Sequence, residues 1–170
     1  MVTCAIVGAT GLVGSTFLKV LEEKNLKIVF VGRKDRFPTP TLDAINKIIL
    51  NTQNNTGMVL NVAFDYGGRN DIVEATKIVT SKVLSGEIMI DEVDEAYLQN
   101  HLYVTSNIDL LIRTSGELRV SNFLLWQMAY AEFYFTKCLW PDFNEKELYK
   151  AIKSFNKRKR RFGGLNREVK

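Results

Sequence analysis

The stretch Met58-Val-Leu-Asn-Val-Ala-Phe-Asp-Tyr-Gly-Gly-Arg-Asn-Asp-Ile-Val-Glu-Ala-Thr-Lys-Ile-Val-Thr-Ser-Lys-Val83 joins a strand pattern to a helix pattern. Its first part, Met58–Phe64, is nearly all apolar, which is typical of a strand covered on both faces. Tyr66-Gly-Gly-Arg69 follows, and we expect there either a tight turn or an anion site at the start of a helix. Apolar residues then recur at helical spacing: Ile72, Ala75, Val79 and Val83.

The same alternation continues on both sides of this stretch. Short apolar runs predict further strands at Thr3–Val7, Lys27–Val31, Leu110–Ile112 and Phe133–Phe135. Strands that alternate with helices predict an α/β fold, in which a single layer of mostly parallel strands is flanked by helices.

Helical spacing also predicts where the remaining helices lie. One covers Ser15–Lys24, and another starts at Thr39, with Thr39 as its cap and Pro40 in its first turn. Asp91 is predicted to cap a third helix that runs through Leu98. The last covers Glu145–Lys159 and should turn three apolar residues inward: Leu148, Ile152 and Phe155.

Composition describes an ordinary globular chain of 170 residues, long enough for one domain with a sizeable core. It has no apolar run of the ~18 residues that a membrane span needs. Cys4 and Cys138 form no metal or redox spacing, which favours a cytoplasmic location. The basic charge is concentrated in residues 156–170, which carry seven basic residues and one acid. We interpret these residues as a solvated helix end without a nucleic-acid partner, although peripheral contact with a membrane stays open.

The segment Asp109–Glu132 carries the strongest chemical signal. Arg113 and Arg119 flank a turn rich in hydroxyl groups and glycine, and Ser121 and Asn122 then precede an apolar stretch that should be a helix. Guanidinium groups bind phosphate oxygens in a bidentate way, and a helix N-terminus adds free N–H groups. The segment therefore predicts a site for a compact anion such as a diphosphate. Glu117, in the same turn, is interpreted as a salt-bridge partner that orients an arginine.

Several blocks in order resemble the cis-prenyltransferases, the undecaprenyl diphosphate synthase family, over about residues 21–165. They are Asn54–Asn61, Tyr66–Arg69, Asp109–Glu132, Trp140–Phe143 and Arg160–Gly164. The resemblance implies condensation of isopentenyl diphosphate onto an allylic diphosphate by a magnesium-dependent homodimer.

The resemblance also assigns roles to individual residues. It implies that Arg113, Arg119 and Ser121 bind the diphosphate of isopentenyl diphosphate, and that Glu132 is a magnesium ligand. Arg161 and Gly163, from the Arg-x-Gly motif, would reach this diphosphate across the dimer interface. A continuous helix after Ser121 would carry Glu132 about 16 Å along its axis. Either that helix ends early, or Glu132 serves another part of the site or a neighbouring subunit.

Residues 1–20 do not match the family's opening, which contains an Asp-Gly-Asn-Gly-Arg-Trp loop. They resemble instead the N-terminus of aspartate-semialdehyde dehydrogenases, with Gly8, Gly11 and Gly14 as a nucleotide-binding turn. The dehydrogenase's catalytic region is absent, so NADP is not expected as a cofactor. We accordingly expect a Rossmann-like βα front over 1–24 packed on the same domain, prenyltransferase sequence over 25–165, and a tail over 166–170.

The resulting functional hypothesis is an isoprenyl transferase whose allylic half is missing. No catalytic residue is assigned, because the family's aspartate is not found, and we expect little turnover from this chain alone. Two alternatives stay open: a non-catalytic subunit that binds a diphosphate or forms a dimer, and an NADP-binding oxidoreductase fragment.

Overall fold

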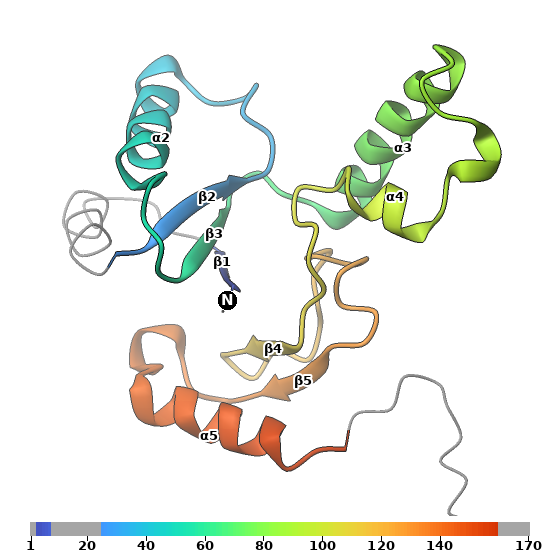
Figure 1. The fold of residues 1–170 in the computed structure, drawn as a ribbon. Helices are drawn as coiled ribbons and strands as arrows, with labels where there is room; N and C mark the ends of the chain where they lie inside the picture. Colours follow the sequence, from blue (N-terminus) through green and yellow to red (C-terminus); the bar gives the residue numbers. More distant parts are fainter. Residues whose placement is uncertain (1–2, 8–24, 160–170) are drawn as a thin grey trace, which may run out of the picture. The chain divides into compact units, whose positions relative to one another are not determined.

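The computed structural model describes residues 3–7 and 25–159. These residues divide into two compact units between Ser81 and Lys82. Both units combine parallel strands with helices, so the α/β class is confirmed (Figure 1). Within the described ranges the hydrogen-bonded strands form one sheet in each unit. No helix among these residues is long and apolar enough to cross a membrane.

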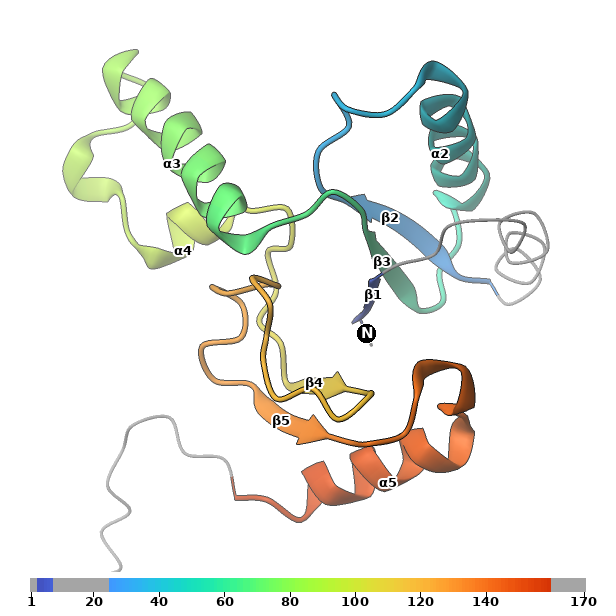
Figure 2. The same ribbon diagram turned by 180° about the vertical axis from the view of Figure 1, so that it is seen from behind.

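The first unit is built on a parallel sheet in the order β1-β3-β2. Its strands are β1 (Thr3–Val7), β2 (Lys27–Val31) and β3 (Val59–Ala63), all at the predicted places. Val59 on the central strand is in register with Thr3 and with Lys27. Helix α2 (Thr39–Thr52) connects β2 to β3, and α3 (Gly68–Leu84) follows β3 (Figures 1 and 2).

Apolar contacts and one buried hydroxyl fix α2 to the sheet. Ile28 and Leu60 form the buried core, against which Ile48 of α2 packs. The buried Thr52 Oγ1 accepts a hydrogen bond from the Ile28 backbone N at 3.1 Å and donates one to the Ile48 carbonyl at 2.9 Å. Because β2 is an edge strand, Thr52 satisfies a backbone N–H that would otherwise be buried without a partner.

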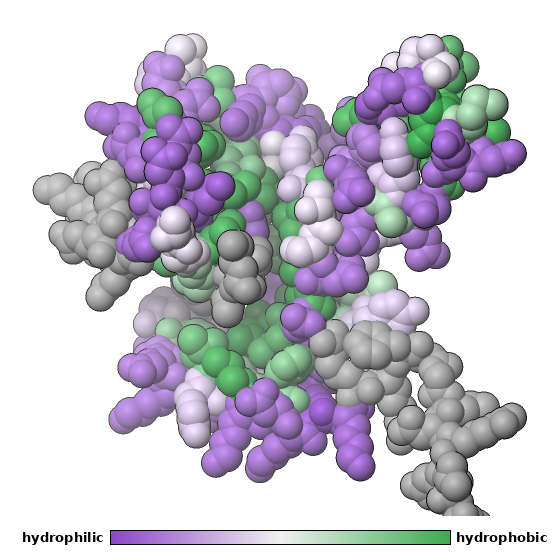
Figure 3. All heavy atoms as spheres, viewed as in Figure 1, coloured by the Kyte–Doolittle hydropathy of each residue, from purple (hydrophilic) through white to green (hydrophobic). Residues whose placement is uncertain are grey.

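The second unit contains a pair of parallel strands covered by a helix. Strand β4 (Leu110–Arg113) pairs with β5 (Glu132–Phe135), with Leu110 opposite Glu132 and Arg113 opposite Phe135. The 3-10 helix η2 (Trp140–Asp142) leads to α5 (Glu145–Asn156), which lies beside β5 in both views (Figures 1 and 2). Figure 3 shows hydrophilic residues along the outer margin of α5 and apolar residues between this margin and the strands.

Two expected helix starts differ in detail. Helix α4 (Glu95–Gln99) is capped by Asp94, whose side chain accepts a hydrogen bond from the Tyr97 backbone N at 2.7 Å. Asp91, the predicted cap, lies in the preceding 3-10 helix η1 (Ile90–Glu92). Helix α2 starts after Pro38, without a side-chain cap, so Thr39 is its first residue rather than its cap.

The inward face predicted for α5 is also partly wrong. Ala151 is the residue of this helix that is fully buried, whereas Leu148 and Ile152 are each 41% exposed. The apolar stripe of α5 is therefore only partly buried, and Ala151 is its most buried position.

The helix expected after Asn122 is absent, and residues 121–130 form a series of turns. Ser121, Asn122 and Leu124 have φ angles of 50°, 61° and 41°, which a right-handed helix excludes. Long-range hydrogen bonds compete with helical ones here. The Gln127 carbonyl accepts from the Ile108 backbone N at 2.9 Å, and Gln127 Nε2 donates to the Val104 carbonyl at 2.8 Å.

Candidate functional site

The two candidate arginines lie on the turn that leaves β4, which we call the arginine turn (residues 113–122). Its first part is held against the chain that follows β5. The Ser115 backbone N donates to the Cys138 carbonyl at 2.8 Å, and the Gly116 N donates to the Thr136 carbonyl at 2.9 Å. Both turn residues are in the left-handed region, with φ of 65° and 71°. The end of β5 thus fixes the point from which the turn projects.

The side chains of the turn leave it with a net positive charge. Arg119 is 66% exposed and forms an ion pair with Glu117, as predicted. Arg113 is half-buried, and no carboxylate within residues 3–7 and 25–159 pairs with its guanidinium. Ser121 is exposed at the end of the turn. Two guanidinium groups, one carboxylate and a hydroxyl therefore share a short exposed segment, a suitable set for an anionic ligand.

The predicted contribution of a helix N-terminus to this site is wrong. Ser121 and Asn122 start no helix, and the N–H groups of Ser115 and Gly116 already donate to backbone carbonyls. A bound anion would consequently depend on the side chains of the turn rather than on a helix dipole.

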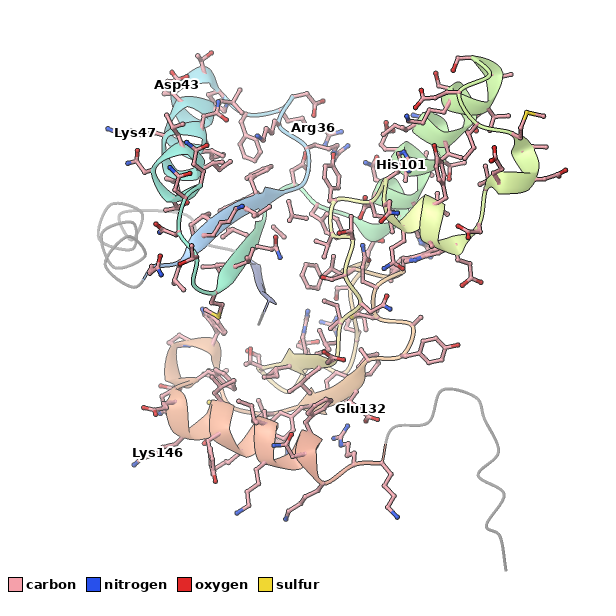
Figure 4. The ribbon with its side chains drawn as sticks, in the orientation of Figure 1. Arg36, Asp43, Lys47, His101, Glu132 and Lys146 are labelled. Carbon is pink, nitrogen blue, oxygen red and sulfur yellow. The ribbon has the colours of Figure 1, made fainter. Side chains whose placement is uncertain are left out.

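Glu132 occupies the opposite end of the strand pair from Arg113. Its place opposite Leu110 puts it three residues back along the ladder, about 10 Å in strand rise. Because no helix follows Ser121, the 16 Å separation along a helix axis does not apply, but Glu132 still lies apart from the arginine turn. Figure 4 shows Glu132 at the start of β5.

The Glu132 carboxylate already has a protein partner. Arg158 Nη1 donates to Glu132 Oε2 at 2.8 Å, and the described residues hold no group of three or more His, Cys, Asp or Glu side chains that could bind a metal ion. Magnesium is often held by one or two carboxylates together with substrate phosphates and water. Glu132 fits that mode through its second oxygen, as a single protein ligand.

Several predicted site residues lie outside the described residues. They are Gly8, Gly11, Gly14, Arg161 and Gly163. Their assigned roles stay predictions.

Some polar contacts of the first unit were not predicted. Asp71, in the first turn of α3, is buried and accepts a hydrogen bond from the Tyr66 hydroxyl at 2.9 Å. Arg33 pairs with Asp65 at 2.9 Å. An acid in the first turn of a helix is a usual sequence signal, whereas nothing in the sequence links Arg33 to a residue 32 positions away.

Arg158 was likewise missed as an individual residue, because it was counted only among the seven basic residues of the tail. Desolvation, followed by the charges of Glu147 and Asp142, raises the pKa of the Cys138 thiol, which disfavours the reactive thiolate.

Comparisons with known proteins agree on one family. The family model described as undecaprenyl diphosphate synthase matches residues 9–163. An isoprenyl transferase from Streptococcus thermophilus is 44% identical over 155 residues, which cover 88% of this chain and 62% of that protein. One from Bacillus cereus is 49% identical over 152 residues, covering 88% of this chain and 59% of that protein. The chain thus spans about three fifths of the length of these curated relatives.

Solved structures show the same relationship. The lavandulyl diphosphate synthase from Lavandula x intermedia, in complex with dimethylallyl diphosphate, has a TM-score of 0.81 and 34% identity, covering 95% of this chain and 79% of that one. A probable undecaprenyl diphosphate synthase from Campylobacter jejuni has a TM-score of 0.79 and 30% identity, covering 89% and 69%.

These matches bear directly on the front of the chain. The family model begins at residue 9 and so includes Gly11 and Gly14, which we had assigned to a dehydrogenase-like turn. The dehydrogenase resemblance and the NADP-binding alternative therefore gain no support from the comparisons, and neither does the alternative of a non-catalytic subunit. The chain belongs to the undecaprenyl diphosphate synthase family, the cis-prenyltransferases.

Proposed function

We propose that this chain provides the isopentenyl diphosphate site of an isoprenyl transferase, which condenses isopentenyl diphosphate onto an allylic diphosphate. The observation that supports the proposal is the arginine turn, in which Arg113, Arg119 and Ser121 project from one segment at the end of β4. Family membership supplies the reaction class, and the bound dimethylallyl diphosphate of the lavender synthase illustrates the kind of allylic substrate expected.

In this reaction the side chains of the arginine turn bind a diphosphate and take no part in bond making or breaking. Two guanidinium groups can each donate paired hydrogen bonds to phosphate oxygens and offset their charge. Glu117 keeps Arg119 in place before the ligand arrives, and Arg113 is the cation of the turn that forms no ion pair with a described side chain. Arg161 and Gly163 would complete the site from a second copy of the chain, as the family resemblance implies.

Magnesium is the cofactor we propose for the same reaction. When bound, it neutralises diphosphate charge and helps the allylic diphosphate to depart. Glu132 would supply a hard carboxylate oxygen for it, alongside oxygens of the substrate and water.

Calorimetric titration with isopentenyl diphosphate in the presence of Mg²⁺ tests this proposal. Loss of the charge-assisted hydrogen bonds in Arg113→Ala should weaken binding by about 1.5–3 kcal/mol, or roughly 10–150-fold. Lys146→Ala is the matched control, because Lys146 is an exposed cation in the first turn of α5 (Figure 4). Equal binding by wild type and Arg113→Ala would refute the proposed site.

A further inference from the structure

The Arg158 guanidinium joins two adjacent groups of β5. Its Nη1 atom donates to Glu132 Oε2 at 2.8 Å and to the Phe133 carbonyl oxygen at 2.9 Å. This nitrogen carries two N–H groups, so each bond can use its own hydrogen. One side chain thereby holds a carboxylate and the backbone carbonyl of the next residue at the same time.

Both ends of this contact are anchored by the backbone. The Glu132 backbone N donates to the Asp109 carbonyl at 2.9 Å, at the point where Glu132 enters the ladder opposite Leu110. Arg158 lies just beyond the end of α5, and its backbone N donates to the Phe155 carbonyl at 3.0 Å. The ion pair therefore connects the start of β5 with the end of α5, 26 residues further along the chain.

The pair is also partly shielded from water. The Glu132 and Arg158 side chains are 27% and 34% exposed, so their attraction is screened less than that of a fully exposed pair. A carboxylate has two oxygens, and Arg158 occupies only Oε2. Metal-ligating carboxylates are commonly oriented by a hydrogen-bonding partner outside the ligand shell, and loss of such a partner typically lowers metal affinity 10–100-fold.

We propose that Arg158 is a positioning residue of the substrate site. It holds the Glu132 carboxylate in one orientation at the start of β5, which leaves Oε1 to bind magnesium together with a diphosphate. This inference rests on the proposed function, because it gives Arg158 a role only if Glu132 helps to bind a metal–diphosphate complex.

The experiment measures how strongly the metal improves ligand binding. Isopentenyl diphosphate is titrated into the full chain once with Mg²⁺ and once with EDTA, and the ratio of the two affinities is the metal enhancement. Arg158→Gln should lower this enhancement about tenfold or more while its affinity in EDTA matches wild type. Arg158→Lys should keep part of the enhancement, because it retains the charge but loses the fork of donors.

A matched control distinguishes the effect of Arg158 at its particular position from the effect of removing any positive charge near the end of α5. Lys153→Gln removes an exposed cation from the last turn of α5 and should leave the metal enhancement unchanged. Urea unfolding checks that every variant is folded. If Arg158→Gln does not fold, Arg158→Lys still tests the proposal.

Three results would overturn the positioning role. Full metal enhancement in Arg158→Gln, or an equal loss of affinity with and without the metal, would make Arg158 a structural residue only. A wild-type affinity that does not respond to Mg²⁺ would do the same. In these cases Arg113-dependent binding would show that the proposed function itself survives. Absence of any Arg113-dependent binding would instead remove both proposals together.

Discussion

At the scale of single residues, Gly32 shows how the end of a strand depends on one missing side chain. Its φ is +132°, and a Cβ built on it would lie 2.0 Å from the Phe64 carbonyl oxygen. Phe64 follows β3 and its backbone N donates to the Val31 carbonyl at 3.0 Å, so neither backbone can easily move away. The glycine is thus required for β2 and β3 to stay paired up to their ends.

We predict that Gly32→Ala lowers the free energy of unfolding by about 3 kcal/mol or more, through backbone strain and a steric clash. Urea unfolding followed by circular dichroism measures the change. Gly86→Ala is the control, because Gly86 also has a positive φ of +75° but no atom within 4 Å of the place that a Cβ would take. It should cost only about 1–2 kcal/mol. Equal effects of the two substitutions would contradict the role of the Phe64 carbonyl.

Thr52 provides a second prediction at the residue scale. Thr52→Val keeps the shape of the side chain but leaves the buried Ile28 backbone N–H without its acceptor. The expected loss of unfolding free energy is about 1–3 kcal/mol. The same substitution at Thr41, an exposed position of α2, should change stability by less than about 0.5 kcal/mol. A neutral Thr52→Val would show that water or a backbone shift replaces the lost bond.

At the scale of elements, the caps of short helices can be tested directly. Asp94→Ala removes the acceptor for the Tyr97 N–H in the first turn of α4 and should destabilise the chain by about 1 kcal/mol. Asp91→Ala, the matched control, removes the same carboxylate three residues earlier, where it caps no α-helix. Thermal unfolding of the two variants measures the difference. A larger effect at Asp91 would restore the helix start that the sequence pattern suggested.

Elements also show why local patterns succeed in one place and fail in another. The strands at Lys27–Val31 and Leu110–Arg113 were predictable because their apolar runs are short and bounded by polar residues. The apolar residues after Asn122 looked equally regular, yet Gln127 bonds to the backbone of the 104–108 segment instead of supporting a helix. Tertiary hydrogen bonds outweigh helical propensity there, since propensity differs by less than about 1 kcal/mol per residue.

At the scale of the whole molecule, the proposed function predicts association of two chains. The Arg-x-Gly residues Arg161 and Gly163 are expected to act on the site of a partner, and large apolar side chains are exposed in the second unit at Leu139, Trp140 and Tyr149. Sedimentation equilibrium should give about twice the chain mass of 19.4 kDa over the micromolar range. A monomer at every concentration would contradict the shared site. As a surface control, Lys146→Ala should associate to the same extent as the wild type.

The sequence alone was enough to determine the α/β class, the five strands of the described residues and the family, because apolar periodicity and blocks such as Tyr66–Arg69 are local signals. It also predicted that Glu117 pairs with an arginine of the same turn, because Glu117 and Arg119 lie only two positions apart. Only the tertiary structure decided that Ser121 starts no helix and that Glu132 lies at the opposite end of the strand pair from Arg113. It alone also paired Glu132 with Arg158. These features depend on contacts between residues far apart in the chain, and local spacing carries no information about which distant groups will satisfy a backbone carbonyl or a carboxylate.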